Sequence, residues 1–170
     1  MKDYAKIVLH AYPFLKTVEK DYEEHVRNKA LLSYRGRQTA EGLAEYLAQE
    51  IIRARNLVWL RTSMERVFAR LNEEERALTA LHYFRKKGAM KAYFERVGQK
   101  PWTDGKFARR KAKLAKKLEA MLRFEGVNED VYEALFSQLS LFQKIKRCLE
   151  KETEKKAPDG AFVGGRCAVN

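Results

Sequence analysis

The sequence predicts an all-α fold. Ala, Leu, Glu, Lys and Arg are frequent among its 170 residues, β-branched runs are few, and there are only three prolines and nine glycines. This composition favours helix almost throughout. Apolar residues also recur at three- and four-residue steps along most of the chain, which is the period of an amphipathic helix. The apolar share of 45% is ordinary for a globular protein, so one domain, or a small domain with a helical extension, is expected.

A long helical hairpin is expected over residues 1–71, as a scaffold with a possible role in dimerisation or partner docking. Pro13 should kink the first helix or begin a new one. Gly36, between Arg35 and Arg37, should end the helical segment. Thr39 should cap a second helix that runs to about Leu71. The apolar stripe of the first helix is Tyr4, Val8, Ala11, Leu15, Val18 and Tyr22. The second helix has two adjoining stripes: Leu43, Leu47, Ile51, Ala54 and Val58, and Leu57, Leu60, Met64, Val67 and Leu71.

A second unit is expected over residues 72–126. Asn72 is an amide cap, and the carboxylates of Glu73, Glu74 and Glu75 follow it in the positive first turn of a helix. Ala77, Leu78, Leu81 and Phe84 form the buried face of that helix, and Lys86-Lys87-Gly88 should close it. The glutamates are better explained by this capping role than by metal binding.

The same unit continues with two further helices. A short helix is expected from Ala89 to about Val97, and a turn containing Gly98 and Pro101 follows it. Thr103 should then cap a basic helix that runs to about Phe124. Its inward positions are Phe107, Leu114, Leu118 and Met121. Three helices with a turn before a capped basic helix form a helix-turn-helix unit.

A C-terminal amphipathic helix is expected over residues 127–154, capped by Asn128. Its apolar positions fall at three- and four-residue steps: Val131, Leu135, Leu139, Phe142, Ile145 and Leu149. Residues 155–170 are small and glycine-rich with no period, and we expect them to be a disordered tail.

Positive charge is concentrated in residues 85–123. This segment has fourteen Lys and Arg and only three acids, so it holds +11 of the chain's net charge of +12. Such a cluster attracts polyanions, and each phosphate that it neutralises releases a counterion. Nucleic acid is therefore the first partner to consider.

The basic helix supplies the candidate DNA contacts. A helix fits the major groove, where its N-terminal residues reach base edges and arginine binds guanine through two acceptor atoms. The candidates in the first two turns are Thr103, Lys106, Arg109 and Arg110. Farther along, Lys113, Lys116 and Lys117 are better placed for contacts to the DNA backbone. Lys100, in the preceding turn, completes the set.

The order LNEEERALTALHYF, then a short helix ending at Gly98, then WTDGKFARRKAKLAKKLEAML resembles the C-terminal, promoter-reading domain (region four) of bacterial sigma factors. The resemblance covers roughly Leu71–Leu122, about a third of the chain. Sigma-like regulators of phage and mobile-element genes in Firmicutes are similar too. The resemblance implies that Thr103, Lys106, Arg109 and Arg110 face DNA and that RNA polymerase is a further partner.

Other classes of function have weaker support. His10, His25 and His82 lie on different predicted helices without a metal-ligand spacing, and no phosphate-binding glycine loop or nucleophile–base motif occurs. We therefore expect no enzyme, cofactor or metal site. Cys148 and Cys167 lack CxxC spacing, which favours two free thiols in a reducing compartment. No segment matches a signal peptide or a membrane span, so a soluble, cytoplasmic protein is expected.

Alternatives remain open for the basic helix and its turn. The basic face could be an ordinary solvated surface, or it could lie on anionic lipid. Trp102 could stack on a base, or it could fill the core at the turn. The main hypothesis is sequence-dependent binding of double-stranded DNA in transcriptional regulation. The alternative is a protein–protein adaptor built on the long helices, which docks on RNA polymerase or a phage component.

Overall fold

The computed structural model describes residues 1–32 and 39–154. These residues form seven helices and no strand, so the predicted all-α class is confirmed. None of the described helices has the length and apolar content that crossing a bilayer requires. The glycine expected to end the first helix and the tail expected at 155–170 both lie outside the described residues.

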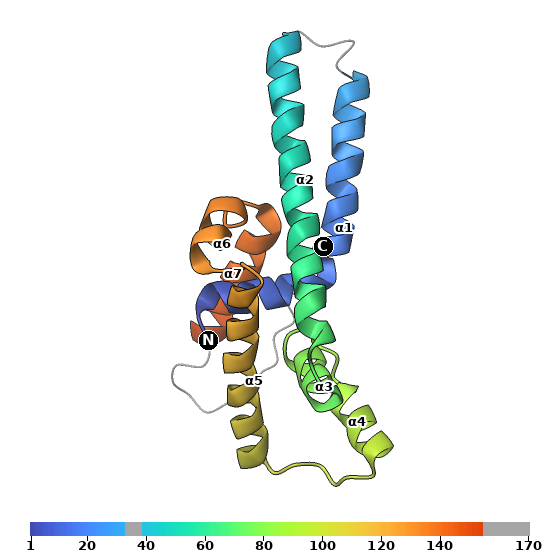
Figure 1. The fold of residues 1–170 in the computed structure, drawn as a ribbon, viewed down its shortest axis with the longest axis vertical. Helices are drawn as coiled ribbons and strands as arrows, with labels where there is room; N and C mark the ends of the chain where they lie inside the picture. The colour runs from blue at the N-terminus through green and yellow to red at the C-terminus, as the bar shows by residue number, and fades with distance from the viewer. Residues whose placement is uncertain (33–38, 155–170) are drawn as a thin grey trace.

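The first helix, α1 (Asp3–Leu32), is long and bent. It contains Pro13, which lacks a backbone N–H and crowds the preceding turn. Figure 1 shows the dark-blue N-terminal part of α1 lying across the molecule, at a large angle to its long upper part. The helix therefore continues through the proline and bends, and it does not restart there. His10 and His25 consequently share this helix, although the sequence suggested separate ones.

The second helix, α2 (Ala40–Ala69), runs beside the upper part of α1 (Figure 1). The Thr39 side chain accepts a hydrogen bond of 3.3 Å from the Gly42 N–H, as a helix cap requires. We call residues 17–32 of α1 and 40–56 of α2 the arm, because they stand away from the other helices in Figure 1. Within α2, the stripe from Leu57 to Val67 is fully buried, whereas Ile51 keeps 41% of its surface exposed.

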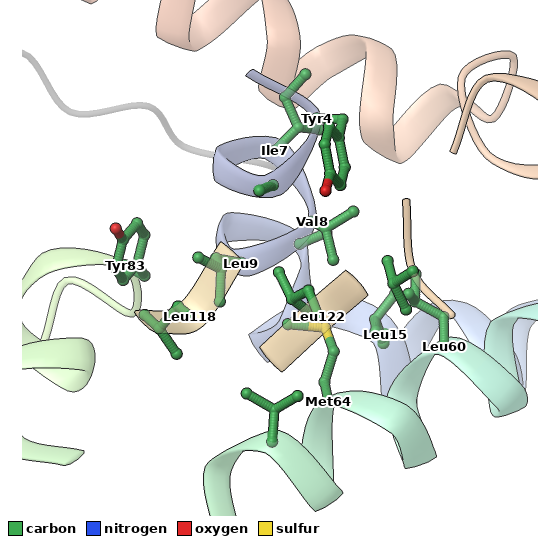
Figure 2. Close-up of a cluster of buried hydrophobic side chains, with 14 of the residues drawn as sticks. Tyr4, Ile7, Val8, Leu9, Leu15, Leu60, Met64, Tyr83, Leu118 and Leu122 are labelled. Atoms are coloured by element: carbon green, nitrogen blue, oxygen red, sulfur yellow. The ribbon is translucent and has the colours of Figure 1, made fainter. Parts of the chain in front are cut away.

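The core lies where the N-terminal part of α1 meets the lower half of α2 and α5 (Asp104–Phe124). Figure 2 shows side chains from these three helices converging. The fully buried members of this cluster include Leu9, Leu15, Leu60, Met64, Leu118 and Leu122. Removing a Leu side chain from water is worth about 1.5–3 kcal/mol. This core therefore holds α5 in place by its apolar face, as the sequence predicted.

Two short helices, α3 (Glu73–His82) and α4 (Ala89–Val97), pack on each other. The Asn72 side chain accepts a hydrogen bond of 2.9 Å from the Glu75 N–H, and the Glu75 carboxylate accepts one of 3.1 Å from the Asn72 N–H. This reciprocal capping box confirms the predicted start of α3.

The end of α3 differs from the prediction, because the helix stops at His82 and does not reach Gly88. Arg85 adopts a left-handed backbone with φ of 55°. The Lys86 N–H then donates a hydrogen bond of 2.9 Å back to the Ala80 carbonyl, six residues earlier. The chain therefore turns before the expected glycine.

The C-terminal region also differs, because the expected single helix is two helices, α6 (Glu129–Leu135) and α7 (Ser140–Glu154). Asn128 caps α6 as predicted, and its side chain accepts from the Val131 N–H at 2.9 Å. At the break, Phe136 is fully buried and its ring lies parallel to that of Trp59, with centroids 6.4 Å apart. The break lets both helices pack against α1, which one straight helix could not do.

Candidate nucleic-acid interface

The basic helix α5 begins after Thr103. The backbone of Thr103 is extended, as an N-cap requires, but its side chain makes no capping hydrogen bond. Asp104 stands in the first turn, where its charge favours the positive end of the helix dipole. Thr103 thus occupies the predicted position as an exposed residue, and its hydroxyl does not cap the helix.

Four cations occupy the outer side of α5. With 100° of rotation per residue, they fall on one stripe opposite the buried leucines Leu114, Leu118 and Leu122. All four are exposed, and the stripe is ~15 Å long at 1.5 Å per residue. We call this set the basic stripe: Lys106, Arg109, Lys113 and Lys116.

The basic stripe carries no internal ion pair to any carboxylate of the described residues. The Arg109 Nε–H donates only a long hydrogen bond of 3.3 Å to the Gly105 carbonyl of its own helix. Lys106 Nζ lies 5.5 Å from the centroid of the Trp102 ring, a cation–π contact that leaves its ammonium exposed. Full positive charge therefore faces solvent along three turns of helix.

Two of the predicted DNA-facing residues lie instead on the flank of α5 next to α3. Arg110 Nη1 lies 3.1 Å from the Glu74 carboxylate. Lys117 Nζ donates to both oxygens of Glu75, at 2.7 and 2.8 Å. Internal carboxylates thus neutralise both cations, although the sequence predicts both as contacts to DNA.

The three consecutive glutamates at the start of α3 each bind a cation from another helix. Glu73 Oε2 lies 3.2 Å from Arg96 of α4, while Glu74 and Glu75 bind α5. Only Glu75 closes the capping box. The capping role predicted from the sequence is therefore present, together with a bracing role that sequence reasoning missed.

Trp102 fills the turn between α4 and α5. Its ring meets Phe94 edge to face, with centroids 5.3 Å apart, and it packs against the core as a partly buried side chain. Arg110 Cζ lies 5.7 Å from its centroid. Trp102 is therefore engaged by the protein itself, which favours the core-filling interpretation over base stacking.

The turn before Trp102 extends the basic surface. Gly98 ends α4 with a left-handed φ of 67°, a conformation that glycine adopts without steric cost. Lys100 follows and is exposed, and Lys86 and Lys87 are exposed in the loop between α3 and α4. These three lysines add to the same cationic segment of the chain.

A groove that the sequence did not reveal lies between the N-terminal part of α1, the end of α3, the middle of α5 and the C-terminal half of α7, with a volume of about 980 Å³. Its cations are Lys6, Arg85, Lys87, Lys111 and Lys146, and its acids are Asp3, Glu150, Glu152 and Glu154. The ion pairs Lys6–Asp3 and Arg85–Glu152 hold part of this charge. The charges nearly balance, so the groove favours neither an anionic nor a cationic ligand.

The described histidines do not form a metal site. His10 is partly buried, and its Nδ1–H donates to the Tyr83 carbonyl at 3.0 Å; burial lowers the pKa of its imidazole. His25 bonds Tyr46 at 2.7 Å. Within residues 1–32 and 39–154, no group of three or more His, Cys, Asp or Glu side chains is arranged to hold a metal ion.

Comparisons with known protein families, with curated proteins and with solved structures found no match for this chain.

Proposed function

We propose that the chain binds double-stranded DNA in a sequence-dependent manner and acts in transcriptional regulation as a sigma-like regulator, with RNA polymerase as a further partner. The observation that supports this most is the basic stripe, whose four exposed cations form no ion pair with a carboxylate in the described part of the chain. The apolar side of the same helix is buried in the core. The cationic side is therefore free for phosphates and base edges.

Residues of the basic stripe have different roles in this proposal. Lys106 and Arg109 lie in the first turns of α5, and an arginine there can read guanine through two hydrogen bonds. Lys113 and Lys116 lie farther along and bind phosphates without reading sequence. Arg110 and Lys117 contribute less than their position suggests, because Glu74 and Glu75 already neutralise them.

The experiment is a fluorescence anisotropy titration with duplexes selected from a random pool, repeated at several salt concentrations. Replacing Lys113 and Lys116 together with alanine should weaken binding roughly 30-fold at physiological salt and reduce the salt slope by about two. Lys20 and Arg27, two exposed cations of the arm, provide the matched control when replaced with alanine. Binding by the first variant with an unchanged slope would show that α5 is not the interface.

Arg109→Ala tests whether the interface reads sequence. It should reduce the preference for a selected duplex over a scrambled duplex, because one base contact is worth about 1–3 kcal/mol of discrimination. An equal loss on both duplexes would instead assign Arg109 to the DNA backbone.

The alternative function is a protein–protein adaptor, for RNA polymerase or a phage component. It is favoured by apolar side chains exposed on the arm, with Leu31 at 71% and Ile52 at 56%. An adaptor would bind duplex DNA no better than it binds heparin at equal salt, whereas the DNA-binding protein would prefer the duplex.

A further inference from the structure

The outer face of α2 in the arm is unpartnered in the described structure. Ile51 and Ile52 keep 41% and 56% of their surfaces exposed, and Ala44 and Ala48 lie beside them, also exposed. The opposite side of α2 is covered by α1. Apolar side chains repeated along one exposed helix face are typical of a surface that another helix covers.

The charges of α2 are segregated along its axis. Residues 40–50 contain three glutamates and no cation, and residues 51–61 contain three arginines and no acid. Glu50 and Arg53 pair with each other, and Arg61 pairs with Glu19 and Glu65. The remaining exposed charges, Glu41, Glu45 and Arg55, have no ion-pair partner among the described residues.

Two of these unpaired charges, Glu41 and Arg55, share a register with Ala48. Glu41, Ala48 and Arg55 are spaced by seven residues, which places them on one stripe of the helix. A second α2 that packs antiparallel, with Ala48 at the crossing point, brings each Glu41 against Arg55 of the other copy. A parallel copy would instead set like charges against each other. Alanine at the crossing also permits close approach of the two backbones.

We propose that a second copy of this chain packs antiparallel on the arm, through the α2 face formed by Glu41, Ala44, Ala48, Ile51, Ile52 and Arg55. Two symmetric ion pairs fix the direction of the helices, and the isoleucines supply the buried apolar surface. This inference does not depend on nucleic-acid binding.

The test measures mass by sedimentation velocity and light scattering over a dilution series of the full chain. The wild type should be a dimer that dissociates on dilution. Glu41→Arg and Arg55→Glu should each weaken the dimer roughly 10-fold, because each change breaks two pairs worth up to about 1 kcal/mol apiece. The double variant should recover the wild-type dissociation constant, because the pairs re-form with reversed sign.

Two further variants separate association from folding. Glu24 is exposed on α1, on the side of that helix away from its buried stripe, so Glu24→Arg makes the same charge change and should leave the mass unaltered. Because Glu41 lies in the first turn of α2, Ile52→Glu serves as a variant that leaves the cap intact, and it should give a monomer with wild-type helicity by circular dichroism. A wild type that is monomeric at every concentration would overturn the proposal. The proposal would also be overturned if the double variant dimerised as weakly as the single variants, or if Ile52→Glu left the mass of the oligomer unchanged.

Discussion

Lys117 of α5 binds both carboxylate oxygens of Glu75, the side chain that also closes the capping box of α3 on Asn72. One carboxylate thus fixes the start of one helix and the orientation of another. It is partly buried, with 18% of its side chain exposed, while Lys117 is 40% exposed. The position of the basic stripe relative to α3 therefore depends on this carboxylate.

Glu75→Gln should destabilise the protein by about 1–2 kcal/mol. The amide can still cap, but it carries no charge for Lys117 or for the positive end of α3. Urea denaturation followed by circular dichroism measures the change. The matched control is Glu73→Gln, which breaks a pair with Arg96 in which both side chains are more than 60% exposed and should cost less than about 0.5 kcal/mol. Equal effects of the two variants would contradict the bracing role.

Glu74→Gln should strengthen DNA binding. It releases Arg110 from the carboxylate that it pairs with in this structure, so one more cation becomes available for phosphate and the salt slope should steepen by about one. Anisotropy titrations at several salt concentrations measure both quantities. The double change Glu74→Gln with Arg110→Gln should return the slope to the wild-type value. No gain from the single change would place Arg110 outside the interface.

His10 should make stability depend on pH. Burial lowers the pKa of His10 from its ordinary value of 6.5, against a smaller raising effect of its hydrogen bond to Tyr83. Above about pH 6.5 the imidazole is neutral in both the folded and the unfolded state, and it adds no pH dependence. As the pH falls below 6.5, the unfolded state binds the proton first, so the free energy of unfolding decreases until the folded-state pKa is reached.

Thermal melts at pH 7.5 and 5.5, which lie about one unit above and below 6.5, check this predicted loss of stability at low pH. His10→Asn keeps a hydrogen-bond donor near the Nδ1 position but does not titrate. The Tm of this variant should therefore decrease less from pH 7.5 to pH 5.5 than the Tm of the wild type. An equal decrease in both proteins would assign the pH dependence to other groups.

Leu118→Ala should destabilise the fold by about 2–5 kcal/mol, because Leu118 is fully buried and its loss leaves a cavity. Phe124→Ala provides the control on the same helix. Phe124 is 77% exposed and contacts Arg70 only through its ring face, at 5.1 Å, so its removal should cost less than about 1 kcal/mol. Urea denaturation compares the two. Similar midpoints would show that α5 is not held by the core.

Local signals in the sequence predicted the features that local interactions decide. Thr39, Asn72 and Asn128 were identified as helix caps, and each accepts the expected hydrogen bond. The apolar spacing of α5 predicted its buried side, and the basic stripe follows from the same period. Caps and buried helix faces are determined by residues within three or four positions along the chain.

The features that the sequence did not predict, such as the break between α6 and α7, involve contacts between residues far apart in the chain. The spacing of Leu135, Leu139 and Phe142 continues a helical period across the break between α6 and α7. At that break Phe136 lies against Trp59, 77 positions earlier in the chain. The pairing of Lys117 with Glu75 likewise joins residues 42 positions apart. Helical periodicity contains no information about such pairs, and the helix-turn-helix arrangement itself stays a prediction.

The bend of α1 at Pro13 has a consequence for how this chain reaches its native state. The N-terminal part of α1 contacts α6 and α7, so residues from the start of the chain meet residues more than a hundred positions later. All-helical proteins usually fold within microseconds to milliseconds because their contacts are local. Here the entropic cost of closing so long a loop must be met before those contacts form, and we expect refolding to be slow for an all-helical protein.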